Sequence, residues 1–214
     1  IKTYQVSSAT IKALEDKNVI EKKSIPVSRI VIKNKTTKAF DLNSDQAVCL
    51  ENILAFYKSK ESVVLLRGVT ASGKTEVYIH LIKQVIEQGL QTLYILPEIG
   101  LTTQIIHRIQ NVFGNSVGFY HSKLNNHERY EIWQKQNSEN PFKIIVGTRS
   151  SLFLPFKKLG QIIIDEEHDY ALKQQAPAPR YHTRDSAIVL AKLLNSNVLL
   201  GSATPSVDTY YNAQ

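Results

Sequence analysis

The sequence predicts an α/β fold in which a mostly parallel sheet is flanked by helices and carries a phosphate-binding loop. Two observations lead to this fold class. From residue 40 onward, apolar segments of strand length alternate with amphipathic segments of helical length, which is typical of a parallel sheet covered on both faces. In addition, a glycine-rich loop that ends in Gly-Lys-Thr stands between the first predicted strand and the next helix.

The elements are placed in order from apolar periodicity and helix-capping signals. The predicted helices cover residues 44–58, 74–88, 102–113 and 183–194, with one more that begins near Asn125 and contains Trp133. The predicted strands cover residues 62–67, 91–97, 116–121, 142–148, 161–165 and 197–201. Gly89 and Gly114 end two helices at C-cap positions, and Asn125 with Glu128 has the spacing of a capping box.

The same patterns predict which side chains are buried. The helix over 44–58 places Val48, Ile53, Leu54 and Tyr57 at its apolar positions. The strand over 62–67 is expected to be buried, and Trp133 is expected to pack in the core.

Residues 1–39 differ from the rest in charge. They carry nine of the 26 Lys and Arg residues and three of the 19 Asp and Glu residues, so most of the net charge of +7 lies there. A short helix that starts near Ser7 or Ser8, with Ile11, Leu14, Val19 and Ile20 around it, and a strand over 28–33 look like the end of a winged-helix module. We therefore expect a partial winged-helix segment with a linker over 1–39 and one α/β domain over 40–214. Basic charge attracts nucleic-acid phosphates, but the charge alone favours a solvated lysine-rich linker.

Composition excludes several classes of protein. The single cysteine, Cys49, rules out an internal disulfide and a four-cysteine zinc site. No apolar run of about 18 residues and no signal-peptide pattern occurs, so we expect no membrane partner and a reducing, cytoplasmic location. The chain contains no methionine and opens at Ile1, which predicts an excised fragment of a longer protein.

The string GVTASGKT at residues 68–75 fits the P-loop pattern. Glycines let the backbone approach phosphate oxygens, and the following helix N-terminus favours an anion. Lys74 is expected to reach the β- and γ-phosphates, and Thr75 to ligate Mg²⁺. The predicted nucleotide-binding residues in this stretch are Gly68, Val69, Thr70, Ala71, Ser72, Gly73, Lys74, Thr75 and Glu76. The alternative is a glycine-rich turn that binds nothing.

A second motif, IIIDEEHD at residues 162–169, delivers acids at the carboxyl end of an apolar strand, where ligands bind in open α/β sheets. Asp165 is expected to hold Mg²⁺ through water, and Glu166 to activate the attacking water. Glu167 adds a third carboxylate, and three adjacent acids are best explained by a nearby cation. A solvated acidic turn is the alternative.

The third motif, GSATPS at residues 201–206, also follows an apolar strand. Its small and hydroxyl side chains allow close packing, so Ser202 and Thr204 are candidates to sense the state of the acidic strand end. A simple strand-to-helix turn with Pro205 at the first helical position is the alternative.

The order P-loop, Asp-Glu-x-His, Ser-Ala-Thr resembles the superfamily 2 helicases. More narrowly, the strings LLRGVTASGKTEVYIHLI, LPEIGLTTQII, HSKLNNHERYEIW, GTRSSLFLPFKKLG, IIIDEEHDYALKQQ, PRYHTRDSAIVLAK and LGSATPSVDTYYNAQ look like the PriA family of bacterial replication-restart helicases (primosomal protein N′). This resemblance implies a first RecA-like lobe over 40–214 that uses ATP and Mg²⁺. It further implies 3′-to-5′ DNA unwinding, single-stranded and forked DNA as substrates, and primosome and replication-restart proteins as partners.

The resemblance also implies roles for individual residues. Gln46 would read adenine, with a capping box from its spacing to Asn43 as the alternative, and His168 would join Ser202 and Thr204 in coupling ATP to DNA. The residues implied to contact DNA are Thr148, Arg149, Ser150, Lys173, Arg180, Tyr181 and Arg184. Two positions depart from the family: Ala71 replaces a glycine, and Leu172 replaces a tyrosine of a DNA-coupling loop at 169–185, a change expected to weaken that coupling.

The family's zinc-binding cysteines and its second RecA-like lobe are expected outside this chain. Because that lobe supplies an arginine finger worth about 10³ to 10⁵ in rate, we expect the 214-residue chain alone to hydrolyse ATP barely. A phosphotransferase, a non-catalytic nucleic-acid-binding module and an RNA helicase remain as alternatives from the motifs alone.

Overall fold

The computed structural model describes residues 7–20, 37–59, 61–98 and 103–214, and its contacts divide the chain into two compact units, Ile1–Val31 and Ile32–Gln214. In the first unit, α1 (Ser8–Asp16) begins where the N-cap Ser7 accepts a hydrogen bond from the Thr10 backbone. The helix ends before Val19, which is 65% exposed. The strand expected at 28–33 lies outside the described residues.

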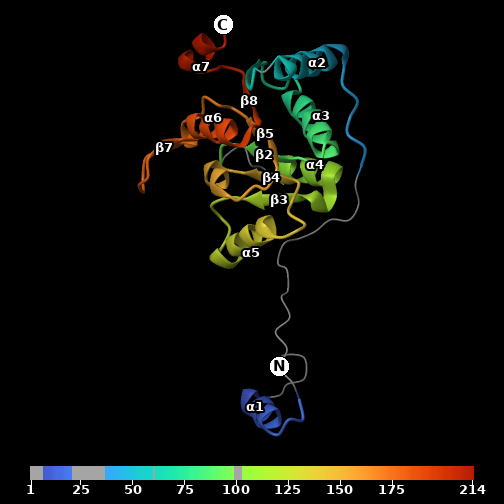
Figure 1. Cartoon of the computed structure of the whole chain (residues 1–214), viewed down its shortest axis with the longest axis vertical. Helices are drawn as coiled ribbons and strands as arrows, with labels where there is room; N and C mark the ends of the chain where they lie inside the picture. Colours follow the sequence, from blue (N-terminus) through green and yellow to red (C-terminus); the bar gives the residue numbers. More distant parts are fainter. Residues whose placement is uncertain (1–6, 21–36, 60, 99–102) are drawn as a thin grey trace. The chain divides into compact units, whose positions relative to one another are not determined.

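The second unit is built on a six-stranded sheet in the order β1-β8-β5-β2-β4-β3, with every neighbouring pair parallel (Figure 1). Its strands are β1 (Val63–Arg67), β2 (Gln91–Ile95), β3 (Val117–Tyr120), β4 (Ile144–Gly147), β5 (Leu159–Ile164) and β8 (Asn197–Ser202). Because the sheet is parallel, all six strands end at one edge, where the three motifs lie. The predicted fold class is confirmed.

Helices cover both faces of this sheet (Figure 1). The helices are α2 (Ser44–Lys58), α3 (Lys74–Glu87), α4 (Thr103–Phe113), α5 (Asn126–Asn137), α6 (Thr183–Leu194) and α7 (Val207–Asn212). Helix α3 packs on β2 and β5 with α2 beside it, α4 and α5 pack on β3, and α6 packs on β5 and β8. One core cluster, on the α2 and α3 side, includes Tyr78 from α3 and Tyr94 from β2.

Three short 3₁₀ helices and a hairpin complete the unit within the described residues. They are η1 (Gly114–Ser116), η2 (Arg149–Phe153) and η3 (Tyr170–Leu172), with antiparallel β6 (Lys173–Gln174) and β7 (Tyr181–His182). The hairpin falls inside the segment 169–185, which the sequence left without regular structure. The capping box predicted from Asn125 and Glu128 is confirmed at the start of α5.

Some burial expectations were wrong. Strand β1 lies at the sheet edge and pairs with β8 alone among the described strands, so it is half-exposed rather than buried. Helix α2 buries Leu50 and Ile53, whereas Val48 is 55% exposed. Trp133 is 49% exposed and stacks on Tyr130, because α5 packs against the outer strand β3 of the sheet.

No helix in the described ranges is both long enough and apolar enough to cross a membrane.

Candidate nucleotide-binding site

The P-loop joins β1 to α3, as the motif requires. Gly73 is the N-cap residue of α3 and has a left-handed φ of 82°. A Cβ atom at Gly73 would also collide with the side-chain amide of Gln46. The left-handed backbone favours glycine here, and the N-terminus of α3, which attracts an anion, lies directly after it.

Lys74 turns back into the loop that precedes it. Its Nζ donates to the carbonyl of Gly68 at 2.8 Å and to that of Val69 at 3.4 Å. The same Nζ lies 3.8 Å from Oε1 of Glu166, and the Lys74 side chain is only 10% exposed. The ammonium group thus lies between the phosphate loop and the acidic strand end, where it can contact an anion held by the loop.

Gln46 links α2 to the phosphate loop. Its side-chain oxygen accepts from the Asn43 backbone and completes a capping box, while Nε2 donates to the Ser72 carbonyl at 3.1 Å. The capping interpretation is confirmed. Adenine recognition by Gln46 remains a prediction, supported by its contact with the loop.

Two tyrosines hold Asp165 in place. The hydroxyl of Tyr78 donates to Oδ1 at 3.1 Å, and that of Tyr94 donates to Oδ2 at 3.2 Å. Burial and the neighbouring Glu166 carboxylate raise the pKa of Asp165, while hydrogen bonds from both tyrosines and the charge of Lys74 act in the opposite direction. Sequence reasoning missed both tyrosines, although Tyr78 lies one turn after Lys74 on the same face of α3.

A nucleotide with Mg²⁺ fits the groups at this site. The loop supplies an ammonium group and a helix N-terminus for an anion. Thr75 and Asp165 both contact the Tyr94 hydroxyl and carry the oxygen ligands that Mg²⁺ prefers. The raised pKa of Asp165 shows that its charge is poorly compensated in the protein alone, and a divalent cation would supply that compensation.

The expected coupling residues lie together. His168 Nδ1 is 3.7 Å from Oε2 of Glu166 and 2.8 Å from the Ser202 hydroxyl. Its Nε2 is 3.4 Å from the Thr204 hydroxyl, and the Thr204 backbone donates to Ser202 Oγ at 3.0 Å. The contacts are possible because β8 lies between β1 and β5 in the sheet, which places the GSATPS motif beside both other motifs.

Glu167 turns away from this group. Its fully buried carboxylate accepts from the Ser206 backbone at 2.7 Å, from the Thr209 hydroxyl at 2.9 Å and from Arg184 at 3.4 Å. The expectation that all three acids face one cation was therefore wrong, because Arg184 is the partner of the third. Ser206 caps α7, so Pro205 precedes the helix instead of starting it.

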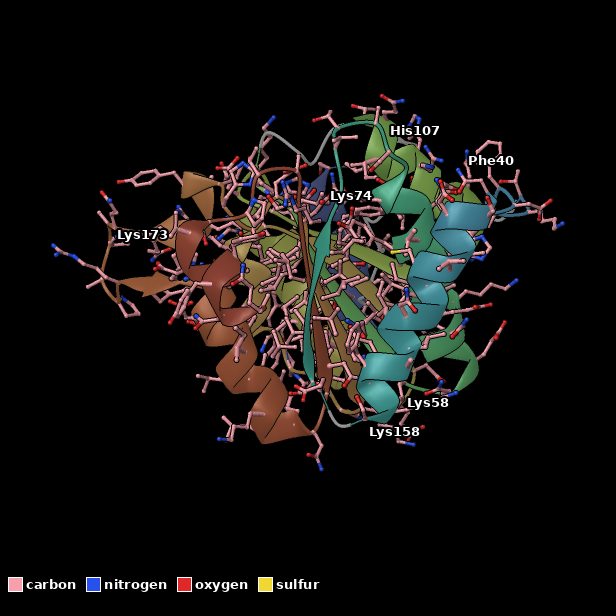
Figure 2. All side chains as sticks on the ribbon, turned by 90° about the horizontal axis from the view of Figure 1, so that it is seen from above. Phe40, Lys58, Lys74, His107, Lys158 and Lys173 are labelled. Atoms are coloured by element: carbon pink, nitrogen blue, oxygen red, sulfur yellow. The ribbon has the colours of Figure 1, made fainter. Side chains whose placement is uncertain are left out.

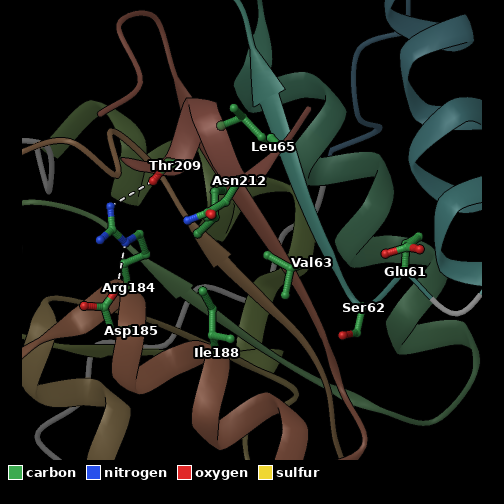
Figure 3. Close-up of a pocket in the computed structure, with 11 residues that line it drawn as sticks. Glu61, Ser62, Val63, Leu65, Arg184, Asp185, Ile188, Thr209 and Asn212 are labelled. Atoms are coloured by element: carbon green, nitrogen blue, oxygen red, sulfur yellow. Dashed lines mark hydrogen bonds and ion pairs between the residues drawn. The ribbon is translucent and has the colours of Figure 1, made fainter. Parts of the chain in front are cut away.

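Arg184 is built into the fold although the sequence placed it among the DNA contacts. Figure 3 shows its guanidinium bonded to Thr209 on one side and Asp185 on the other. Its side chain is 14% exposed. The cavity in this view has a volume of about 400 Å³, is lined from β1, β8, α6 and α7, and includes no P-loop residue.

The carboxylate of Glu76 also points elsewhere. Glu76 is 8% exposed and pairs with Arg108 of α4, whose guanidinium lies over the Phe40 ring at 5.4 Å. The structure thus places this side chain in the contact between α3 and α4. Its backbone N–H donates to the Gly73 carbonyl at 2.9 Å, so nucleotide binding by Glu76 stays a prediction.

The other expected DNA contacts are placed unevenly. Lys173 and Arg180 are exposed on the hairpin segment, while Thr148 is 3% exposed. Arg149, which is followed by the half-buried Ser150, donates to the carbonyls of Ala171 and Lys173 and so anchors the start of the hairpin.

The aromatic residues of the loop after the acidic motif also differ in exposure. Tyr181 packs edge-on against Phe153 at 5.0 Å, and Phe153 is 63% exposed. Tyr170 is 67% exposed, whereas Leu172 is 1% exposed. The leucine that departs from the family pattern therefore faces the interior, and Tyr170 provides an exposed ring two residues earlier.

Comparison with known proteins gives a consistent result. The family model described as DEAD/DEAH box helicase matches residues 43–213. Replication restart protein PriA of Bacillus subtilis (strain 168) is 40% identical over 217 residues, a match that covers 100% of this chain and 27% of the relative. PriA of Chlamydia pneumoniae is 37% identical over 219 residues, covering 100% of this chain and 29% of the relative. The chain thus spans less than a third of the length of these relatives.

Among solved structures, the chain is similar to the structure described as RecG bound to a three-way DNA junction. The TM-score is 0.58 at 20% identity, and the match covers 98% of this chain and 24% of the other. This likeness supports the fold, while the identities to PriA confirm the resemblance predicted from the motifs. The chain belongs to the DEAD/DEAH box helicase family and is similar over its whole length to the replication restart protein PriA.

Proposed function

We propose that this chain is the ATP-binding lobe of an ATP-dependent DNA helicase of replication restart. The whole protein is proposed to move 3′-to-5′ on single-stranded DNA and to unwind forked DNA in the cytoplasm, with primosome proteins as partners. The 214-residue chain alone is expected to hydrolyse ATP slowly. Residues 1–39 are proposed to be the end of a winged-helix domain that contributes basic charge to DNA binding.

One observation carries this proposal: an unbroken series of contacts runs through all three motifs. It passes from Lys74 to Glu166 at 3.8 Å, from Glu166 to His168 at 3.7 Å, and from His168 to Ser202 at 2.8 Å. A small-molecule kinase needs the first contact, but it has no need for the later ones. A motor needs them all, because the state of the nucleotide must reach a surface that grips another molecule.

The residues divide the chemistry as follows. ATP supplies a phosphoanhydride bond whose hydrolysis releases the free energy that drives movement. Lys74 and the N-terminus of α3 hold its phosphates, and Thr75 with Asp165 would hold Mg²⁺. Glu166 orients and deprotonates the attacking water, and its place next to Lys74 keeps its carboxylate at the phosphate loop.

The hairpin β6–β7 is the proposed reader of DNA for this site. The segment that begins it is tied to the site by Asp169, whose backbone donates to the Glu166 carbonyl at 2.8 Å. Its far end is tied by Thr183, which donates to the Leu172 carbonyl at 2.6 Å. Bases stacked on exposed Tyr170 would contribute about 1–3 kcal/mol each, and their binding would act directly on the turn that carries Glu166.

The test is ATP hydrolysis by the intact protein, with and without single-stranded and forked DNA. We expect both DNAs to stimulate hydrolysis. Lys74→Ala should abolish hydrolysis and unwinding while its Kd for forked DNA stays within about twofold, since charge elsewhere dominates DNA affinity. Lys83→Ala, an exposed lysine on the same helix α3, is the matched control and should behave as wild type.

Other outcomes identify the alternatives. Joint loss of DNA binding and hydrolysis in Lys74→Ala would make Lys74 a structural residue. Transfer of the γ-phosphate to a small acceptor would indicate a phosphotransferase, and stimulation by RNA but not by DNA would indicate an RNA helicase. Absence of nucleotide binding in calorimetry would reduce the chain to a non-catalytic nucleic-acid-binding module.

A further inference from the structure

A lysine-rich hollow lies at the edge of the sheet where the strands begin. Its volume is about 440 Å³, and its walls come from the segments that precede β2, β3, β4 and β5 and from the end of α5. Four lysines line it, namely Lys135, Lys143, Lys157 and Lys158. Figure 2 shows Lys74 of the phosphate loop and Lys158 of the hollow toward opposite ends of the strands.

The hollow is held together by Gln91, which is 5% exposed. Its Nε2 donates to the Phe142 carbonyl at 2.8 Å, and its Oε1 accepts from the backbones of Lys157 and Lys158 at 3.0 and 3.1 Å. One buried amide therefore joins the loops before β4 and β5. The backbones of Lys157, Lys158 and Lys143, which follows Phe142, are consequently held in place before any ligand arrives.

A second set of contacts closes the rim. Lys157 Nζ donates to the Ser138 carbonyl at 2.8 Å, so this side chain crosses from the loop before β5 to the end of α5. The Lys143 backbone donates to the Ser116 carbonyl at 2.9 Å, which joins the loops before β4 and β3. The side chains of all four lysines are exposed, so their charges are accessible to a ligand.

The positive charge here is a local concentration. Residues 40–214 carry seventeen Lys and Arg against sixteen Asp and Glu, so this part of the chain is nearly neutral as a whole. Among the described residues that line the hollow, however, four lysines face a single acid, Glu139. Four ammonium groups gathered in one hollow of a nearly neutral domain favour the binding of a polyanion there.

We propose that this hollow binds the phosphate backbone of nucleic acid, as a second contact separate from the ATP edge of the sheet. The inference rests on the proposed function, because it takes DNA as the polyanion. Lysine acts as a flexible point charge that contacts phosphates without reading bases. The site is therefore independent of sequence and raises affinity wherever the DNA passes this end of the lobe.

The test is the Kd of the intact protein for DNA, measured by fluorescence anisotropy over a range of KCl concentrations. The variant is Lys143→Ala with Lys158→Ala, and its matched control is Lys83→Ala with Lys192→Ala, two exposed lysines on α3 and α6. Loss of two phosphate contacts should raise Kd roughly tenfold near physiological salt and lower the slope of log Kd against log salt by about 2. Lys143→Arg with Lys158→Arg should restore both.

Blunt duplex, tailed duplex and single-stranded DNA separate the two possible sources of the backbone. If Kd rises only for the blunt and tailed duplexes, the hollow binds the duplex. If Kd rises only for the tailed duplex and the single strand, the hollow binds single-stranded DNA. Either result supports the inference. An unchanged Kd and slope with all three DNAs overturns it. If DNA still stimulates hydrolysis in that case, the proposed function stands alone. If DNA never stimulates hydrolysis but the lysine variant still binds DNA more weakly than wild type, the proposed function fails and the hollow keeps its role as a phosphate-binding site.

Discussion

Arg184 at the start of α6 contacts the buried carboxylate of Glu167, which directly follows the proposed catalytic Glu166. The distance is 3.4 Å, and Glu167 has no exposed surface. Arg184 also donates to the hydroxyls of Ser206 and Thr209 at 2.8 Å each. This arrangement ties the end of the hairpin segment, the acidic motif and the helix after GSATPS to one buried acid.

Removal of Glu167 should therefore be costly. Glu167→Ala leaves the Arg184 charge without its buried partner and removes the acceptor of the Ser206 backbone and the Thr209 hydroxyl. We expect the free energy of unfolding to fall by about 3–5 kcal/mol, the usual cost of breaking a buried pair from one side. Urea unfolding followed by circular dichroism at pH 7 measures it.

The matched control uses the same arginine. Asp185 also pairs with Arg184, at 2.8 Å, but its side chain is 61% exposed. Asp185→Asn should therefore cost less than about 1 kcal/mol. Equal losses in the two variants would show that the buried network contributes no more than a surface pair.

A second relationship concerns Gly201, which lies one residue before the end of β8, next to Asp165. A Cβ atom at Gly201 would collide with the Tyr78 hydroxyl and come within 3.3 Å of Asp165 Oδ1. Gly201→Ala should move Tyr78 off Asp165, lower the free energy of unfolding by about 1–3 kcal/mol, and weaken Mg²⁺-dependent nucleotide binding. Chemical denaturation and calorimetry provide the two measurements.

The double variant separates steric from other effects at Gly201. Tyr78→Phe removes the hydroxyl that the new Cβ atom meets first. If the collision is the cause, Gly201→Ala costs less in the Tyr78→Phe background than in wild type, and the two changes are not additive. Strict additivity would refute this account.

Ala71, one of the two departures from the family, has a left-handed φ of 63°. This conformation costs a non-glycine residue about 1–2 kcal/mol. Glycine avoids that strain, but it loses more conformational entropy on folding, which offsets part of the gain. Ala71→Gly should raise the free energy of unfolding by up to about 1 kcal/mol. Val69→Gly in the same exposed loop is the control: Val69 is not among the described residues with positive φ, so the change should not stabilise. Differential scanning calorimetry of both variants decides the matter.

The convergence of the motifs could be predicted because a parallel sheet brings the carboxyl ends of its strands to one edge. The order of the strands in the sheet could not be predicted. β8 lies between β1 and β5, and this order places His168 against Ser202. No local pattern encodes that order, although the three motifs constrain it once they are assumed to meet.

Other parts of the site could not be predicted, because they depend on directions of side chains that sequence spacing does not give. Glu166 has a left-handed φ of 48°, so the chain turns there and sends Glu167 to the opposite side from Lys74. Trp133 was wrongly placed in the core because apolar spacing cannot tell a helix at the sheet edge from one over its middle. In α5 the buried residues are Ile132 and Gln136.

The last prediction concerns the protonation of Asp165. Burial and Glu166 raise the pKa of this carboxyl above its ordinary value of 3.8, so between the two values the folded protein binds more protons than the unfolded chain. The free energy of unfolding therefore falls as pH rises from 3.8 through the raised pKa, and it stays lower above it. Asp165→Asn, without ligand, should be more stable than wild type at pH 7, and the difference should shrink as pH falls toward 3.8.

Mg²⁺ reverses the order of the two proteins because the ion needs the ionised carboxylate. With nucleotide and Mg²⁺, wild type should gain stability at pH 7 while Asp165→Asn gains little. That gain should decline on acidification sooner than for an ordinary carboxylate, since a proton competes with the ion at a group whose pKa is raised. The nucleotide also titrates in this range, but it does so equally with both proteins. Subtracting the gain of the variant from that of wild type therefore cancels this contribution. Thermal melts from about pH 4 to 8, with and without nucleotide and Mg²⁺, measure both differences, and an equal gain in both proteins would remove Asp165 from the metal site.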